Sequence, residues 1–341
     1  VGDNGEVTKK DLSLQKEGYY EQGDFTGKKG VERFYEKQLR GLKGERYFYV
    51  DRTGVNKGSY KDGKLDYDPV DGKNISLSID IDLQQYGEKL LDNKMGSVVA
   101  IEPKTGEILS LISSPFYNPA NFNIQNTGKY YTRAINDPTK PIFNRAVSAP
   151  YPPGSTFKPI MALIGLEDKA ISSSTHFNCN GQYRLGKRII KCHFHPSYTS
   201  LKQSIASSCN TYYCHTFKNM MGSSKYQNSE EAYKSWRSYL TSFGLGSKLG
   251  TDISGEFKGW LKESSYYDKM HGKDRWNYSR IISLSFGQGE LGLTPIQIAN
   301  AVSIIANRGY YFTPHVIKKI EGMKSIPQQY LVKNYTAISQ S

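Results

Sequence analysis

Several features that define common protein classes are absent from this sequence of 341 residues. It contains no run of about 18 apolar residues, so no segment is suited to cross a membrane as a helix. Its first residues lack the basic and apolar regions of a signal peptide. We therefore expect any export signal or membrane anchor to belong to a segment outside this sequence.

Patterns typical of nucleic-acid binding are also missing, although the chain carries a net charge of +13. The basic residues form no arginine-rich helix, no zinc-finger spacing and no RNA-binding aromatic motif. Charge alone suits any acidic partner, including nucleic acid, anionic lipid and cell-wall polymer. We expect no nucleic-acid partner.

The composition changes near residue 68, which predicts two domains in a chain that is long for one. Residues 1–68 are polar and glycine-rich, with one helical pattern at 30–39, and indicate a small accessory domain. Residues 69–341 form the second expected domain. It opens with elements typical of an antiparallel sheet beside a helix, namely a strand at 75–80, a helix at 83–91 and a hairpin of strands at 97–101 and 108–112.

Helical patterns dominate the later part of the chain. Residues 114–154 are rich in Pro, Asn and Tyr and predict a long ordered loop. The helices expected after it cover 157–166, 201–221, 229–243 and 295–307. The last follows a glycine turn at 287–290, whose Gln288 and Glu290 we interpret as structural, and has Thr294 as its N-cap. Strands in one part and helices in another predict an α+β fold.

The stretch Tyr-Pro-Pro-Gly-Ser-Thr-Phe-Lys-Pro at residues 151–159 carries the clearest chemical signal. Residues three apart on a helix share a face, so the Lys158 amine can reach the Ser155 hydroxyl. Such a pair suits covalent catalysis, because a serine hydroxyl needs an adjacent group that accepts its proton. Pro159 is tolerated only in the first turn of a helix, so the helix must begin near Ser155. Its free N–H groups would then face the oxyanion that attack by Ser155 creates.

A second motif, Ser208-Cys209-Asn210, follows Ser155 after 53 residues. Its hydroxyl can relay a proton between lysine and a leaving group, and its amide can hold Lys158 and a substrate carbonyl. An N-cap serine beside a surface lysine is the alternative interpretation of Ser155 and Lys158. The order of the two motifs favours a catalytic site.

A third segment, Gly-Gln-Gly-Glu-Leu-Gly-Leu-Thr-Pro-Ile-Gln at 287–297, completes a specific pattern. Together the three segments resemble the class B penicillin-binding proteins of the elongation type. Residues 30–41 are similar to the pedestal region of that group, and 79–84 to the start of its transpeptidase domain. The resemblance implies a transpeptidase domain of the penicillin-binding and serine β-lactamase type, an antiparallel sheet with helices, preceded by a small pedestal or dimerisation-like domain.

The resemblance implies a D,D-transpeptidase that cross-links peptidoglycan stem peptides ending in D-Ala-D-Ala, without a cofactor for catalysis. Ser155 would attack the peptide carbonyl, Lys158 would accept its proton, and Ser208 and Asn210 would relay protons and position the substrate. Penicillin and other β-lactams would acylate Ser155. The implied partners are a membrane glycosyltransferase and proteins of the elongation complex. The implied location is the periplasmic face of the bacterial inner membrane, with the N-terminal anchor outside this sequence.

Other functions share the fold. A serine β-lactamase is disfavoured by the pedestal-like N-terminal residues and by the lack of a recognisable deacylating glutamate motif. A division-type transpeptidase is disfavoured by the cysteines and histidines described below. A penicillin-sensing or degenerate scaffold is disfavoured by the intact motif residues.

One part of the family pattern is out of place. The resemblance implies a Lys-Ser/Thr-Gly motif on a strand that follows the second motif and lines the cleft. The only Lys-Thr-Gly of this sequence lies at 104–106, before Ser155, where it predicts a hairpin turn. We therefore expect the sequence to end before the strands that carry the third motif, which puts the activity of this chain by itself in question.

Cysteines and histidines gather between and within the two motifs. Cys179, Cys192 and Cys209 are accompanied by His193 and His195, and the Cys-x-x-His spacing of Cys192 and His195 lets one turn direct both at a single metal. Three thiolates and one imidazole suit tetrahedral zinc. Some members of the elongation-type group that the sequence resembles have metal ligands at matching places, and we favour His195 as the fourth ligand. Disulfides, which export would favour, and buried free thiols remain alternatives.

Overall fold

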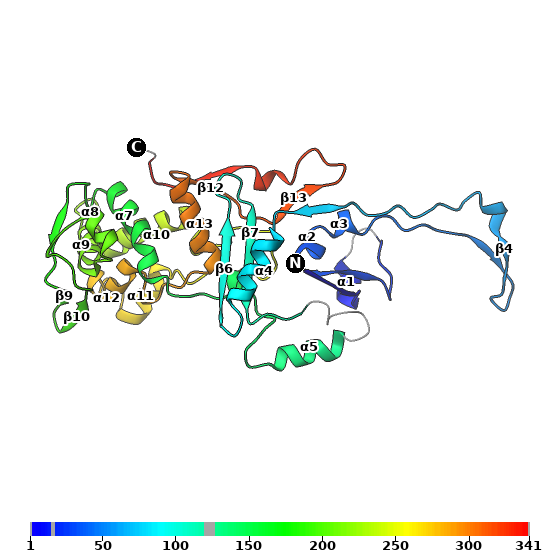
Figure 1. Ribbon diagram of the computed structural model, residues 1–341, viewed down its shortest axis with the longest axis horizontal. Helices are drawn as coiled ribbons and strands as arrows, with labels where there is room; N and C mark the ends of the chain where they lie inside the picture. Colours follow the sequence, from blue (N-terminus) through cyan, green and yellow to red (C-terminus); the bar gives the residue numbers. More distant parts are fainter. Residues whose placement is uncertain (1, 15–17, 119–126, 340–341) are drawn as a thin grey trace. The chain divides into compact units, whose positions relative to one another are not determined.

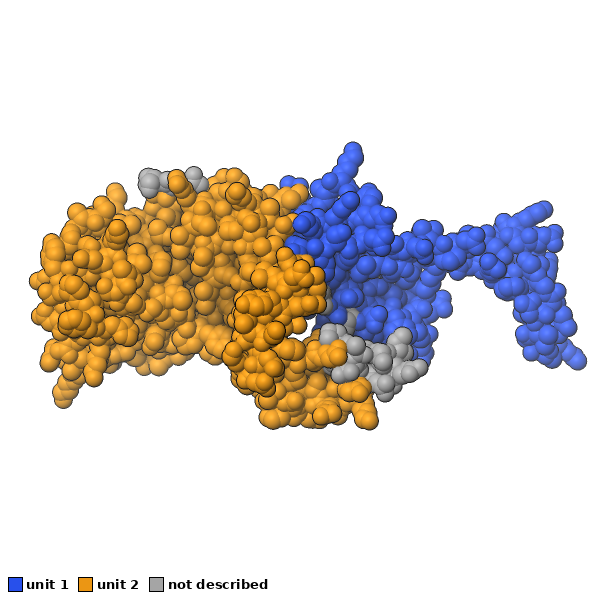
Figure 2. Space-filling model, viewed as in Figure 1, with its two compact units in different colours: residues 1–78, 252–254, 315–328 blue, residues 79–251, 255–314, 329–341 orange. Residues whose placement is uncertain are grey.

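The computed structural model describes residues 2–14, 18–118 and 127–339, and its chain divides into two compact units (Figure 2). Unit 1 comprises residues 1–78, 252–254 and 315–328, and unit 2 comprises 79–251, 255–314 and 329–341. Unit 1 therefore contains two short segments from later in the chain, 252–254 and 315–328, in addition to the N-terminal residues. The predicted boundary at residue 68 took account of the N-terminal segment alone.

Unit 1 consists of short antiparallel strand pairs and short helices (Figure 1). The pairs are β1 (Gly2–Glu6) with β2 (Phe25–Lys29), β3 (Phe48–Val50) with β4 (Asn56–Ser59), and β5 (Ile75–Leu77) with β13 (Ile317–Ile320). The helices are α1 (Lys9–Leu14), α2 (Gly30–Phe34) and α3 (Glu36–Leu39). The helix predicted over 30–39 is thus interrupted at Tyr35, whose φ of −112° is not helical.

A buried carboxylate joins distant segments within unit 1. Asp252 is fully buried, and its two oxygens accept hydrogen bonds from the backbone N–H groups of Val316 (2.8 Å) and Ile317 (3.0 Å). The Tyr35 hydroxyl donates to the same carboxylate at 2.8 Å. These charge-assisted bonds satisfy a charge that would be costly to bury unpaired, and no local sequence pattern reveals them.

The sheet part of unit 2 begins with the predicted hairpin. Its elements are α4 (Ile81–Leu90), β6 (Gly96–Ile101) and β7 (Ile108–Ser114), and β6 pairs with β7 in antiparallel register. The turn between them contains Gly106 at φ +79°, whose N–H donates to the Glu102 carbonyl at 2.9 Å, so the prediction that Lys-Thr-Gly forms a turn is confirmed. Helix α4 lies beside this hairpin (Figure 1).

The remaining helices of unit 2 include several that the sequence predicted. They are α5 (Thr127–Asn136), α6 (Arg145–Ser148), α7 (Lys158–Glu167), α8 (Leu201–Ala206), α9 (Asn210–Met221), α10 (Ser229–Ser242), α11 (Ser264–His271), α12 (Tyr278–Ile281) and α13 (Pro295–Ala306). Its further strands are β8 (His176–Asn178), β9 (Gln182–Leu185), β10 (Arg188–Lys191), β11 (Tyr198–Ser200), β12 (Tyr310–Phe312) and β14 (Lys333–Tyr335). The prediction of an α+β fold agrees with this mixture.

Two further predictions of local structure are corrected in unit 2. The loop expected over 114–154 contains α5 and α6, while its residues 119–126 lie outside the described part. The helix expected over 201–221 is two helices, α8 and α9, separated at Ser207–Cys209. The break matters for function, because it falls on the second motif.

The core of unit 2 is aromatic and lies between α7, α9 and α10. Trp236 is fully buried and contacts Phe217 and Phe157 edge to face, with ring centroids 5.5 and 6.3 Å away. Its indole N–H donates to the Met161 sulfur at 3.3 Å. Burying such side chains stabilises the fold by ~2 kcal/mol each. Packing of Phe157 and Met161 against Trp236 therefore fixes the start of α7.

Candidate active site

Ser155 lies in a 3₁₀ helix, Gly154–Phe157, that runs directly into α7. We call residues 154–158 the nucleophile turn. Phe157 is fully buried and Lys158 is only 2% exposed. These two buried side chains anchor the turn to the interior of unit 2. Backbone N–H groups in the first turn of a helix have no helical acceptor, so an oxyanion site at this turn stays a prediction.

The structure brings Ser155, Lys158 and Ser208 into mutual contact. The Lys158 Nζ lies 3.2 Å from the Ser155 Oγ and 2.8 Å from the Ser208 Oγ. The two hydroxyl oxygens are 2.7 Å apart, with Ser208 placed to donate to Ser155. Lys158 also donates to the Ser208 carbonyl at 2.5 Å. These contacts form a closed triangle through which a proton can move between a nucleophile, a base and a second hydroxyl.

Burial lowers the pKa of Lys158, which suits the role of a base. Desolvation lowers the pKa of Lys158 from its ordinary value of 10.5, and the nearby thiols of Cys209, Cys192 and Cys214 oppose that shift. A lower pKa increases the fraction of neutral amine near neutral pH, and only the neutral amine can accept a proton from Ser155.

Ser208 occupies a strained backbone conformation at the break between α8 and α9. Its φ of +53° lies in the left-handed region, which costs a residue other than glycine about 1–2 kcal/mol. Cys209 follows as the N-cap of α9, and its Sγ accepts from the Tyr212 N–H at 3.3 Å. The positive φ of Ser208 thus turns the chain between the last residue of α8 and the N-cap of α9, and the Ser208 hydroxyl reaches Ser155.

Asn210 makes a different contact from the one expected. The sequence predicted an amide that could hold Lys158, whereas in this structure the Asn210 Nδ2 donates to the backbone carbonyl of Lys191 at 2.8 Å. Lys191 ends β10. The bond ties the start of α9 to the β9–β10 hairpin.

A glycine that the sequence assigned only to a turn supports the nucleophile. Gly287 has φ +74°, and a Cβ at this position would lie 2.4 Å from the Gly154 carbonyl oxygen and 2.7 Å from the Phe157 Cβ. The Gly154 N–H donates to the Gly287 carbonyl at 2.8 Å. Any side chain here would therefore displace the nucleophile turn. The sequence signal was the Gly-x-Gly pair itself, whose contact with the distant segment it could not show.

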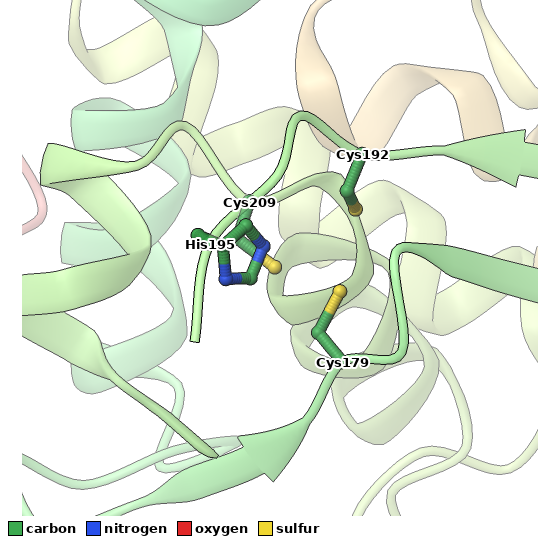
Figure 3. Close-up of side chains that lie close together, drawn as sticks. All are labelled: Cys179, Cys192, His195 and Cys209. Carbon is green, nitrogen blue, oxygen red and sulfur yellow. The ribbon is translucent and has the colours of Figure 1, made fainter. Parts of the chain in front are cut away.

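The four predicted metal ligands meet beside the second motif (Figure 3). One ligand atom from each of Cys179, Cys192, His195 and Cys209 lies within 4.8 Å of the other three, and we call these residues the thiol–imidazole cluster. Cys179 follows β8, Cys192 follows β10 and Cys209 caps α9, so the cluster joins three elements.

His193 and the fourth cysteine of the chain, Cys214, lie outside the cluster. All four cysteines are free thiols, which does not match the disulfide alternative. His193 is not a member of the group, in keeping with the choice of His195. Cys214 is fully buried and accepts a hydrogen bond from the Ser285 hydroxyl at 3.8 Å. We therefore treat Cys214 as a packing residue.

The thiols of the cluster shift one another's pKa in opposite directions. A hydrogen bond from the Cys209 thiol is the largest cause that lowers the pKa of Cys192. Hydrogen bonds from the hydroxyl and the N–H of Thr211 lower it further. The corresponding bond and burial raise the pKa of Cys209. The Nε2 of His195 is buried and has no hydrogen-bond partner among the described residues. Three thiols and an unsatisfied imidazole nitrogen form a donor set that a thiophilic metal could occupy.

Comparison with known families and proteins agrees with this geometry. The family described as penicillin binding protein transpeptidase domain matches residues 96–341, and the penicillin-binding protein dimerisation domain matches residues 1–77. The peptidoglycan D,D-transpeptidase MrdA of Acinetobacter baumannii is 32% identical over 337 residues, which are 95% of this chain and 46% of that protein.

Two solved structures have the same fold. The PBP2 of Pseudomonas aeruginosa, solved in complex with WCK 5153, is 27% identical with a TM-score of 0.79, and the match covers 99% of this chain and 67% of that one. The PBP2 of Helicobacter pylori in its complex with MreC is 26% identical with a TM-score of 0.76, covering 97% of this chain and 59% of that one.

The chain spans about half the length of the curated relatives that it matches. Among the residues that the structure describes, no helix has the length and apolar character needed to cross a bilayer.

Proposed function

The chain belongs to the penicillin-binding protein family, and from that premise we propose that it forms part of a D,D-transpeptidase that cross-links peptidoglycan stem peptides during cell elongation. The observation that carries the proposal is the triangle of Ser155, Lys158 and Ser208, with contacts of 2.7 to 3.2 Å. A degenerate scaffold would have no need to keep a buried lysine against two hydroxyls, because burying a charge is costly.

The proposed reaction uses each group of the triangle. The Ser155 Oγ attacks the carbonyl of the terminal D-Ala-D-Ala bond as its proton passes to the neutral Lys158 amine. The backbone N–H of Ser155 stabilises the oxyanion, because the N–H of Gly154 before it already donates to the Gly287 carbonyl. The D-Ala amine leaves with a proton delivered through Ser208, and an ester to Ser155 remains. An acceptor amine then attacks the ester carbonyl and restores the free serine.

β-Lactams would acylate Ser155 in the same way, because they present a strained amide to the same nucleophile. We propose a location at the periplasmic face of the inner membrane, with an anchor in a segment outside this sequence. We also propose a membrane glycosyltransferase and elongation proteins as partners, since the H. pylori relative forms a complex with MreC.

The thiol–imidazole cluster is proposed to hold a structural zinc ion. Its three thiols and the buried, unpaired His195 nitrogen fit a closed tetrahedral site, whose zinc would cross-link the ligands without taking part in the reaction. Cys209 is flanked by Ser208 and Asn210. The cluster residues would therefore hold the second motif at its distance from Ser155 and keep Ser208 in its strained conformation.

The proposal is tested by incubating the full-length protein with a stem pentapeptide ending in D-Ala-D-Ala. We expect release of D-alanine together with a cross-linked product, and loss of both in Ser155→Ala. Release of D-alanine without any cross-link would indicate a hydrolase instead, and turnover that persists in Ser155→Ala would show that another group is the nucleophile.

A further inference from the structure

Acidic residues are absent from a long segment that includes the second motif. Residues 169–229 contain no Asp or Glu, although 32 acidic residues in a chain of 341 would place about six in a segment of this length. The segment carries eight basic residues, Lys169, Arg184, Lys187, Arg188, Lys191, Lys202, Lys218 and Lys225. It thus concentrates more than half of the net charge of +13 in about a sixth of the chain.

Part of this charge lies on an exposed face of the β9–β10 hairpin. Side chains alternate between the two faces of a strand, and the inward positions Tyr183 and Ile190 are buried. The outward positions include Arg184, Ile189 and Lys191, which are exposed, and the half-buried Gln182. In the register Arg184 lies opposite Ile189, and Gln182 opposite Lys191. Three residues beyond Lys191, Phe194 has a relative exposure of 103%, the full exposure of a free phenylalanine. We call Arg184, Ile189, Lys191 and Phe194 the cationic rim.

The rim is attached directly to the candidate active site. The Asn210 amide donates to the Lys191 carbonyl at 2.8 Å. Lys191 precedes Cys192 and Phe194 precedes His195, and both of these neighbours belong to the same cluster as Cys209. Cys209 in turn follows Ser208, whose hydroxyl is 2.7 Å from that of Ser155. The rim therefore borders the Ser208 side of the site.

The chemistry of acyl transfer identifies what approaches from that side. Ser208 is placed to give a proton to the departing amine, and the entering amine must lose its proton along the same path in reverse. The acceptor nitrogen attacks the ester carbonyl, the new amide bond forms as the Ser155 ester breaks, and the proton returns through Ser208 and Lys158 to the Ser155 Oγ. The acceptor peptide thus enters beside Ser208.

We propose that the cationic rim binds the acceptor strand, an acidic peptide, through carboxylate contacts to Lys191 and Arg184 and apolar contact with Phe194. A stem peptide ending in D-alanine carries at least its terminal carboxylate, which suits basic side chains from a segment without acidic residues. A fully exposed phenylalanine beside a reactive site is explained when a ligand covers it. This inference rests on the proposed transpeptidase function and adds the residues that select its second substrate.

The test separates the two half-reactions in the full-length protein. Acylation is measured with a fluorescent penicillin, which needs no acceptor. Transfer is measured from a donor pentapeptide to either of two acceptors, a free fluorescent D-amino acid or an acidic stem peptide. The variants are Lys191→Glu and Phe194→Ala, with Lys218→Glu as the matched charge control. Lys218 is exposed and lies eight residues beyond Asn210 on α9, ~12 Å along the helix.

We expect both rim variants to lower transfer to the stem peptide about ten-fold, the loss of one charge-assisted contact or one apolar anchor. Transfer to the D-amino acid and acylation should change less than about two-fold, because neither reaches the rim, and Lys218→Glu should resemble the wild type. Equal transfer to the stem peptide in all variants would overturn the proposal, as would a parallel loss of acylation, which would mark the residues as structural.

A second arm asks whether the rim faces lipid instead. If Lys191→Glu weakens binding to vesicles of anionic phospholipid but leaves stem-peptide transfer unchanged, the surface serves a membrane and the inference is wrong. A wild-type protein that penicillin does not acylate would refute the proposed function itself, an outcome distinct from all of these.

Discussion

The two sides of the candidate site are held in place by different means. The nucleophile turn with Ser155 and Lys158 lies on a buried aromatic core and against the backbone of Gly287. The turn with Ser208 lies at a helix break, in a strained conformation, next to a cluster of free thiols and one histidine. We infer that packing fixes the position of Ser155, whereas binding of a metal ion in the cluster governs the position of Ser208, the proton relay.

The largest effect is expected at Lys158, whose amine contacts both the Ser155 and the Ser208 hydroxyl. Lys158→Met keeps a buried side chain of similar length but removes the amine, and should slow acylation by penicillin about 10³-fold. Stability should not fall, because the charge is replaced by an apolar group. Lys218→Met, at an exposed position, is the control. Acylation at the wild-type rate in Lys158→Met would contradict this account, because it would show that the amine between Ser155 and Ser208 is not the base.

Gly287→Ala tests the packed side. The new methyl group would lie 2.4 Å from the Gly154 carbonyl, at a φ of +74° that disfavours alanine. We expect a loss of about 3 kcal/mol in the free energy of unfolding, from overpacking and backbone strain together, and slower acylation. Gly250→Ala is a matched control, because its φ is +86° but no atom lies within 4 Å of its Cβ position.

That control should lose only about 1 kcal/mol, measured by urea unfolding. Equal losses in the two variants would mean that the contact with Gly154 contributes nothing.

Ser208→Gly tests the strained side. Glycine accepts a φ of +53° without strain, which stabilises the folded state. It also raises the conformational entropy of the unfolded chain, which destabilises the folded state by a similar free energy. The free energy of unfolding should therefore change by less than about 1 kcal/mol. Loss of the relay hydroxyl should slow acylation about 10²-fold. Urea unfolding and stopped-flow acylation of the same preparation check both statements. A large loss of stability would contradict the assignment of the strain to Ser208.

The cluster is tested by Cys192→Ser with Cys214→Ser as its control. Both residues are free thiols, but only Cys192 belongs to the cluster. We expect Cys192→Ser to lose bound zinc, measured by atomic emission, and to slow acylation about ten-fold, as for other changes in the surroundings of a metal. Treatment of the wild type with a chelator should have the same effect. Equal zinc content in Cys192→Ser and the wild type would refute the site.

The smallest expected effect is a shift in the pH dependence of acylation. The neutral amine of Lys158 is the reactive form, so the rate should rise with pH and reach half its maximum at the pKa of Lys158. Burial lowers that pKa, so the midpoint should lie below the ordinary lysine value of 10.5. A midpoint at or above 10.5 would indicate that the amine is solvated in the working enzyme.

The sequence predicted the nucleophile turn better than the Ser208 turn, and the reason is physical. Ser155 and Lys158 are three residues apart in one helix, so local geometry suffices to place them together. The apolar pattern of 201–221 continues through the break at Ser208, and a serine with positive φ has no local signal. The cluster ligands were indicated by residue type, by the Cys-x-x-His spacing of Cys192 and His195, and by the resemblance to the family.

Long-range contacts were the other omission. The support that Gly287 gives to Gly154 joins residues 133 positions apart, and the bonds of Asp252 to Val316 and Ile317 join residues 64 and 65 positions apart. Such contacts depend on tertiary packing, which periodicity and turn chemistry do not encode.

The measurement that tests the central claim most directly is mass spectrometry of the full-length protein after incubation with a labelled penicillin. The account predicts one covalent adduct, located on Ser155 within the peptide that contains residues 151–159, and its loss in Ser155→Ala. An adduct that persists in Ser155→Ala, or a wild-type protein that remains unlabelled, would contradict it.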